Sequence, residues 1–159
     1  MQAQEIFEKL QEKFGQDIVE LTDAPPSDPF IVVNKDKILD ISLFLRDEEG
    51  LNFDYMSCLS GVQNKDNSFT VVYHLYSIDI KHRIAIKAHL GEEDPKIDTV
   101  ERVWRTADWH EREAYDMYGI IFEGHHNLIR ILTPYDWEDY PLRKDYKTPD
   151  EYHGIKVPY

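Results

Sequence analysis

The chain contains a single cysteine, Cys58, and this scarcity excludes several classes of protein. One thiol cannot form a disulfide within the chain, so the sequence lacks the framework of a small secreted disulfide-rich domain. A four-thiolate zinc or iron–sulfur site within this chain is excluded for the same reason. Because Cys58 lies in the apolar stretch FDYMSCLSGV, we expect it to be a buried small hydrophobic residue.

Glycine clusters, long apolar runs and basic residues are also scarce. The seven glycines are scattered, so no Gly-rich phosphate-binding loop is present. The sequence contains no run of about 20 apolar residues, the length that a membrane-spanning helix needs. The N-terminal stretch MQAQEIFEKLQEKFG lacks the features of a signal peptide. The 18 basic and 31 acidic residues give a net charge of -13, which disfavours binding to nucleic acid or to anionic lipid. We therefore expect contact with a membrane only through a partner protein.

The sequence does contain the material for a folded core, since 42% of its 159 residues are hydrophobic. Apolar spacing predicts helices at residues 3–14 and 35–46, and a third helix at 100–118 with a break near Ala107. Runs rich in β-formers predict strands at 17–21, 30–33, 53–60, 68–77 and 82–90. Together they predict an α+β fold, with a mixed or antiparallel sheet and helices on one side.

The last 41 residues differ from the rest of the chain. They show no sustained periodicity and contain four prolines, at positions 134, 141, 149 and 158, yet they are rich in aromatic residues. Disordered tails are normally poor in aromatics, so this segment needs a surface to lie against. We predict an α+β core at residues 1–118 and an extended irregular C-terminal arm at 119–159 that wraps the core or a partner subunit.

A dense acid–base cluster, DWHEREAYDMYGI at residues 108–120, lies at this boundary. HEREA begins like a zinc-protease motif, but Ala114 stands where the second histidine is required. The acids Glu111, Glu113 and Asp116 point in different directions on a helix, so they predict no shared metal site. No serine or cysteine stands in a nucleophile setting. We expect this chain to supply no catalytic, cofactor-binding or metal-binding residue.

A helical projection places Glu111 in the middle of an otherwise apolar stripe formed by Trp104, Ala107, Ala114, Tyr115 and Tyr118. A buried carboxylate is unfavourable unless it is paired, so Glu111 needs a cationic partner. The candidates lie in the arm: Arg130, Arg143 and Lys144. We also expect Arg112 to pair with Asp116 one turn along the helix. Alternatively, the helix kinks near Ala107 and Glu111 is exposed.

Residues 100–154 carry a signature that resembles the family of the 30 kDa subunit (the C subunit) of respiratory complex I. The matching positions are Glu111, Arg112, Glu113, Asp116, Gly119, Ile120, Phe122, Gly124, His125, Arg130, Ile131, Leu132, Trp137 and the run 141–146. EYHG at 151–154 is a weaker match. Three positions depart from the family pattern: His126 replaces the usual proline, Ile129 an arginine and Asp139 a glycine.

The resemblance implies a non-catalytic subunit in the peripheral arm of a proton-translocating NADH:quinone oxidoreductase. It implies docking on the homologue of the 49 kDa subunit (the D subunit) near the quinone-reducing end, with the B and I subunits as neighbours. The complex uses FMN, iron–sulfur clusters, NADH and quinone, and the resemblance implies that this chain binds none of them. It also implies a peripheral location on the cytoplasmic side of the bacterial inner membrane.

On this interpretation the acid–base cluster is an ion-pair framework that shapes a docking surface, formed by Glu111, Arg112, Glu113, Asp116, His125 and Arg130. Aromatic residues and arginine dominate binding energy at interfaces. The interface candidates in the arm are therefore Trp137, Tyr140, Arg143 and Tyr146, together with Lys144 and Asp145 of the same stretch. Two other functions stay open: the equivalent subunit of a membrane-bound hydrogenase or of the photosynthetic ferredoxin:plastoquinone oxidoreductase, and a stand-alone enzyme that uses the histidine–acid cluster.

Overall fold

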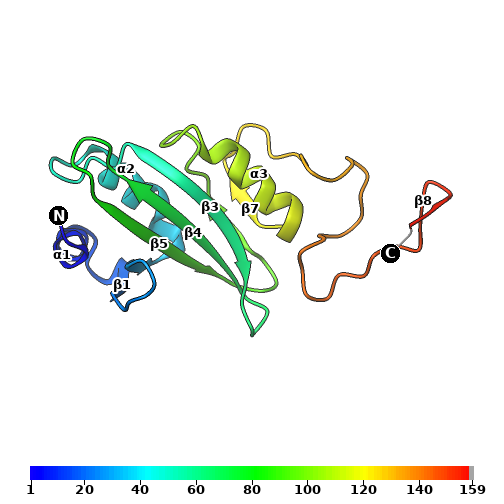
Figure 1. Cartoon of the computed structure of the whole chain (residues 1–159), viewed down its shortest axis with the longest axis horizontal. Coiled ribbons are helices and arrows are strands. Elements are labelled where there is room, and N and C mark those ends of the chain that lie inside the picture. Colours follow the sequence, from blue (N-terminus) through cyan, green and yellow to red (C-terminus); the bar gives the residue numbers. More distant parts are fainter. Residues whose placement is uncertain (158–159) are drawn as a thin grey trace.

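Five strands form a mixed sheet in the computed structural model, which describes residues 1–157 (Figure 1). The order across the sheet is β1-β2-β5-β4-β3. The strands are β1 (Ile18–Thr22), β2 (Phe30–Val33), β3 (Tyr55–Gln63), β4 (Phe69–Tyr76) and β5 (Arg83–Leu90). Strands β3, β4 and β5 pair as an antiparallel meander, β2 lies parallel to β5, and β1 closes the other edge antiparallel to β2. The mixed sheet predicted from the sequence is confirmed.

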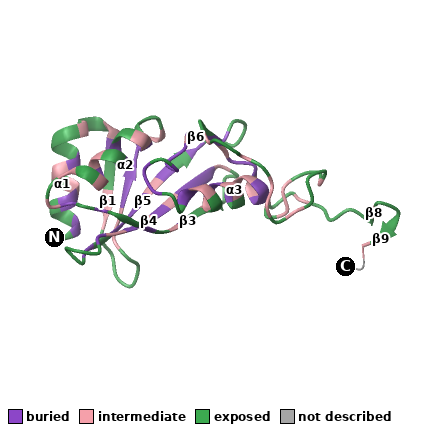
Figure 2. Cartoon of the chain, turned by 90° about the horizontal axis from the view of Figure 1, so that it is seen from above, coloured by how far each residue is buried: buried purple, intermediate pink, exposed green. Residues whose placement is uncertain are grey.

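Three α-helices accompany the sheet: α1 (Ala3–Phe14), α2 (Ile38–Asp47) and α3 (Ala107–Tyr118). Short 3-10 turns, η1 (Gly15–Asp17) and η2 (Lys35–Lys37), precede β1 and α2. Apolar residues of all three helices join those of the sheet in one buried cluster, and Figure 2 shows buried residues along the strands and on parts of the helices. No helix among residues 1–157 is long and apolar enough to cross a membrane.

Helix α3 packs closely on β3 because Gly61 presents no side chain there. A Cβ atom at Gly61 would lie 2.9 Å from the Ile120 side chain and 3.1 Å from the Tyr118 ring. Below α3, the short strands β6 (Lys96–Asp98) and β7 (Ile121–Glu123) pair in parallel. This pair was not predicted, since three residues are too few to show a periodic pattern.

The structure corrects two expectations. Helix α3 begins at Ala107 and not at residue 100, because the preceding segment is a turn in which the N–H groups of Val103 and Trp104 donate to Val100. The Trp104 indole donates to the Phe53 carbonyl at 2.7 Å, which holds this turn against the sheet. Cys58 is half-buried and not fully buried, since the β3–β4 pairing shifts register between Met56 and Cys58.

Residues 124–150 contain neither helix nor strand (Figure 1). The chain runs past α3 and ends in a small hairpin of β8 (Glu151–Tyr152) and β9 (Ile155–Lys156). The division of the chain at residue 118 stays a prediction, and β7, just beyond it, pairs with β6 of the preceding region. The last proline of the arm, at position 158, lies outside the described residues.

Candidate functional site at helix α3

Helix α3 carries two buried acidic residues and ends in a sharp turn. Glu111 and Asp116 are both fully buried. The helix ends at Gly119, which adopts the left-handed conformation at φ 75° and donates its N–H to the Tyr115 carbonyl at 2.8 Å. Burial of Glu111 agrees with the stripe read from the sequence, and the alternative of an exposed Glu111 is wrong.

Glu111 is satisfied by neutral donors. Its carboxyl accepts the Val100 N–H at 2.8 Å and a short hydrogen bond from the Thr99 hydroxyl. Burial raises the pKa of Glu111 to about 8, and the negative charges of Glu101 and Asp108 act in the same direction, whereas the two hydrogen bonds act against them. The predicted pairing of Glu111 with an arm cation is therefore wrong: the structure lets this carboxyl lose its charge near neutral pH.

Arg130, one of the three cations considered as a partner for Glu111, instead reaches Asp116. Arg130 Nη1 lies 2.9 Å from Asp116 Oδ1, so the predicted pairing of Asp116 with Arg112 is also wrong. Arg112 lies 4.0 Å from Asp108 and its guanidinium stands over the Trp109 ring, 4.8 Å from the centroid.

Asp116 is held by more hydrogen bonds than any other carboxylate of the site. Its Oδ2 accepts three successive backbone N–H groups, at distances of 2.9, 2.7 and 2.9 Å, from Ile131, Leu132 and Thr133. Its Oδ1 accepts Arg130 and, in a short hydrogen bond, the Thr133 hydroxyl. Burial alone would raise the pKa of Asp116, but the hydrogen bonds of Thr133, Leu132 and Arg130 outweigh it and hold the pKa at about 2. Asp116 therefore fixes the backbone of residues 130–133 to α3.

A second anchor holds the arm over the end of α3. Arg143 Nε donates to the Tyr118 carbonyl at 2.7 Å, and the guanidinium stands 4.7 Å from the Tyr140 ring centroid. A Cβ atom at Gly119 would lie 2.5 Å from Tyr140 and 2.7 Å from Arg143, so this close approach requires glycine. Tyr140 in turn meets Tyr115 edge to face, with ring centroids 6.2 Å apart.

The other predicted interface residues divide between internal contacts and solvent. Lys144 ties the arm to the β3–β4 hairpin, since its N–H donates to Gln63 at 2.8 Å and its ammonium donates to the Asn64 carbonyl. Trp137 is half-buried against Tyr152 of the terminal hairpin, with ring centroids 5.0 Å apart. Tyr146 is half-buried, whereas Asp145 and the framework residue Glu113 are exposed.

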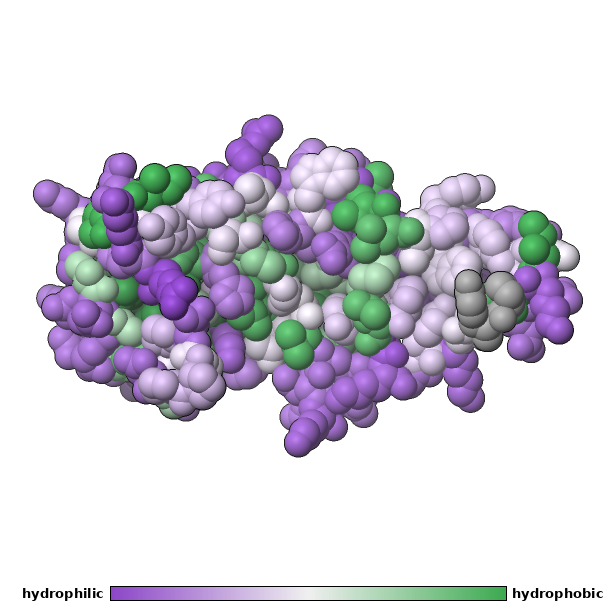
Figure 3. All heavy atoms as spheres, viewed as in Figure 1, coloured by the Kyte–Doolittle hydropathy of each residue, from purple (hydrophilic) through white to green (hydrophobic). Residues whose placement is uncertain are grey.

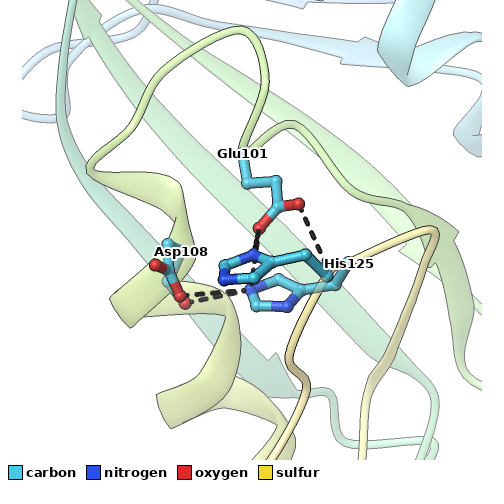
Figure 4. Close-up of side chains that lie close together, drawn as sticks. Glu101, Asp108 and His125 are labelled. Carbon is cyan, nitrogen blue, oxygen red and sulfur yellow. Dashed lines mark hydrogen bonds and ion pairs between the residues drawn. The ribbon is translucent and has the colours of Figure 1, made fainter.

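A histidine–acid cluster lies at the other end of α3, and Figure 4 shows its side chains pointing toward one another. The fully buried ring of His125 lies within 3.5 Å of Glu101 and Asp108, and His126 Nδ1 lies 2.6 Å from Glu101. Sequence reasoning singled out His125 but missed Glu101, Asp108, Thr99 and Thr133 as site residues. Asp108 is the first residue of the acid–base motif and could have been found from it. Thr99 and Glu101 lie at the start of the helix predicted over 100–118, which is a turn in the structure, so the predicted helix did not bring them to this site.

Large apolar side chains are exposed to solvent at several places on the molecule. Six of them belong to α3 and the arm, with exposures from 51% to 92%: Trp109, Ile129, Leu132, Tyr135, Leu142 and Ile155. Figure 3 shows separate apolar groups over the part of the molecule where α3 and the arm lie, and others at the opposite end. None of these six was among the predicted interface residues.

Comparison with known proteins gives a consistent result. The profile of the family described as "Respiratory-chain NADH dehydrogenase, 30 Kd subunit" matches residues 31–152. The C subunit of NADH-quinone oxidoreductase from Chloroherpeton thalassium is 51% identical over 154 residues, which cover 96% of this chain and 64% of the relative. The same subunit from Chlorobium phaeobacteroides is 48% identical over 161 residues, which cover 99% of this chain and 96% of the relative. The chain thus spans less than two thirds of the first relative and nearly all of the second.

Two solved structures share the fold. The trypsin-resistant fragment of Nqo5 matches with a TM-score of 0.63 and 24% identity, covering 77% of this chain and 99% of the fragment. A chain of the archaeal membrane-bound sulfane sulfur reductase matches with a TM-score of 0.75 and 24% identity, covering 91% of this chain and 85% of that one. At this identity the likeness concerns the fold alone.

Proposed function

Because the chain belongs to the 30 kDa subunit family of the respiratory-chain NADH dehydrogenase, we propose that it is a non-catalytic subunit of the peripheral arm of a proton-translocating NADH:quinone oxidoreductase. It docks on the homologue of the 49 kDa subunit (the D subunit) near the quinone-reducing end, with the B and I subunits as neighbours. Other subunits hold the FMN and the iron–sulfur clusters and bind NADH and quinone. The chain meets the membrane only through the complex, on the cytoplasmic side.

The observation that supports docking is the exposure of large apolar side chains on α3 and the arm. Trp109 is 62% exposed, Leu132 61% and Tyr135 92%, although each has a large side chain that gains from removal from water. Exposed apolar side chains mark protein–protein contact sites where they form a contiguous patch rimmed by polar residues. Buried aromatic residues then supply much of the binding energy at such contacts.

The hydrogen bonds between α3 and the arm support the same proposal. Asp116 holds the backbone of Ile131, Leu132 and Thr133, and Arg112 Nε lies 3.5 Å from the Ile129 carbonyl. The exposed side chains are therefore presented by a backbone that is already ordered. Binding by a preorganised surface loses less conformational entropy than binding by a flexible segment.

The experiment is an affinity purification of the tagged chain from mildly solubilised native membranes, assayed for NADH:quinone reductase activity. We expect a large flavin- and iron–sulfur-containing assembly with that activity to co-purify. An assembly that instead carries hydrogenase or ferredoxin-dependent activity would assign the chain to a related complex. A chain that emerges alone would contradict docking and would reopen the histidine–acid cluster as an active site.

A further inference from the structure

Three separate segments bring the histidine–acid cluster together (Figure 4). Glu101 lies in the turn after β6, Asp108 in the first turn of α3, and the two histidines in the turn after β7. One nitrogen or oxygen atom from each of the four residues lies within 4.8 Å of all the others. Imidazole nitrogens and carboxylate oxygens are the donors, besides thiolate, that bind zinc in proteins.

Two of the distances in the cluster match those around a tetrahedral ion. Zinc ligands about 2.0–2.1 Å from the metal lie about 3.3 Å from one another. His125 Nε2 lies 3.4 Å from Glu101 Oε2 and 3.5 Å from Asp108 Oδ1. The fourth ligand, His126, is closer, with Nδ1 2.6 Å from the same Glu101 oxygen. Its side chain is 60% exposed, so it can move outward by the small distance that a shared ion requires.

The cluster contains a buried oxygen atom that an ion could bind. Asp108 Oδ1 is buried and has no hydrogen-bond partner within the described chain. The Glu111 carboxyl also lies near the cluster, 3.9 Å from His125 Nε2. Opposing charges come from arginines: Arg112, 4.0 Å from Asp108, and two that line the solvent opening beside the cluster, Arg102 and Arg105. Glu101, Asp108 and His126 line the same opening, which gives an ion access from solvent.

We propose that this cluster is a zinc-binding site that cross-links three segments of the chain, with the ligands Glu101, Asp108, His125 and His126. Both histidines bind as neutral rings, so the proton of His126 Nδ1 that now bonds to Glu101 is transferred through solvent to Nε2 of this exposed ring. The His125 proton moves from Nε2 to Nδ1. The Asn127 N–H, which donates to His125 Nδ1 at 3.0 Å from an exposed position, must then turn away from the ring.

The test is a zinc titration of the purified full-length chain after removal of metal with a chelator. Competition with a chromophoric chelator measures affinity and stoichiometry, and Co2+ substitution reports the geometry through its visible absorption. We expect one zinc ion per chain, the intense bands of tetrahedral Co2+, a shifted backbone amide signal of Asn127, and no competition by Mg2+. Because even outer-shell changes weaken metal sites by about 10–100-fold, His126→Ala and Glu101→Gln should each weaken zinc binding by at least about tenfold.

The arm offers a matched control. His153 is an exposed histidine paired with Asp136 at 2.8 Å, but it has no second histidine beside it. His153→Ala should leave zinc affinity unchanged. Equal weakening by His153→Ala, unaltered binding in His126→Ala, or no binding by the wild-type chain would each overturn the proposal. His126 is exposed, so its variant should fold, and His126→Asn provides a second substitution if circular dichroism shows that His126→Ala does not.

Discussion

Gly119 is the residue at which two separate constraints meet. Its φ of 75° is a conformation that side chains disfavour, and a Cβ atom there would also lie 2.5 Å from the Tyr140 ring. We expect Gly119→Ala to lower the free energy of unfolding by more than the ~1–2 kcal/mol that the left-handed conformation alone imposes, because the arm must also move away from α3. Urea denaturation monitored by circular dichroism measures this loss.

Gly154 allows the effect of the backbone conformation to be measured apart from the effect of the close contact. It has the same φ of 75°, but a Cβ atom there would meet nothing within 4 Å. Gly154→Ala should therefore show the conformational penalty alone. If both variants lose the same stability, the contact of Gly119 with Tyr140 and Arg143 contributes nothing to holding the arm.

For individual residues, the sequence predicted which side chains are buried but not which groups they contact. The 3.6-residue period placed Glu111 on the buried face of α3, because a helix fixes which residues share a side. Its partners could not be found this way, since Thr99 and Val100 come from a turn whose course depends on the packing of Trp104 against the sheet. For the same reason Arg130, one of the three candidate partners of Glu111, is found to bind Asp116.

Among the elements, α3 holds the arm chiefly through the ionised carboxylate of Asp116. Its pKa of about 2 lies below the ordinary value of 3.8, so the carboxylate adds stability that is fully present above about pH 4 and is lost as the pH falls through about 2. We expect Asp116→Asn to remove roughly 2 kcal/mol at neutral pH. The difference between wild type and variant should shrink as the pH falls from 5 toward 2, as measured by denaturation at each pH.

Hydrogen exchange tells whether this loss is local to the arm. In Asp116→Asn the amides of Ile131, Leu132 and Thr133 should exchange faster, because an amide group cannot accept all their hydrogen bonds. Asp136 is the control: it also accepts side-chain hydrogen bonds in the arm, from Tyr152 and His153, but it is exposed. Faster exchange at residues 131–133 in Asp136→Asn as well would show that the arm loosens for reasons unrelated to α3.

The elements themselves were predictable in proportion to their length. Strands β4 and β5 and helices α1 and α2 have eight or more residues, and their periodic burial follows the apolar pattern. The three-residue strands β6 and β7 gave no pattern, and they form only because they pair with each other across a gap of more than 20 residues. The irregular course of residues 124–150 followed from prolines and lost periodicity, but its anchors did not.

For the whole molecule, the arm has an inner and an outer side, and only some of its residues can face a partner. The sequence favoured Tyr140, Arg143 and Lys144 as interface residues because of their type. The structure engages all three within the chain, against the end of α3 and the β3–β4 hairpin. The residues left in solvent, such as Leu132 and Tyr135, are ones that composition alone did not single out.

This division predicts two different ways to impair assembly. Arg143→Ala should lower both the stability of the isolated chain and the yield of the complex, and it should lower that yield more than any His→Ala change, because it frees the arm from α3.

Tyr135→Ala should lower the yield while leaving the denaturation midpoint unchanged, since the Tyr135 side chain is 92% exposed and its loss removes only a contact with the partner. The measurement pairs urea denaturation of each purified chain with its co-purification from membranes. A normal yield of the complex for Arg143→Ala would mean that the arm is not part of the docking surface. A lower denaturation midpoint for Tyr135→Ala would mean that this ring stabilises the fold of the chain itself.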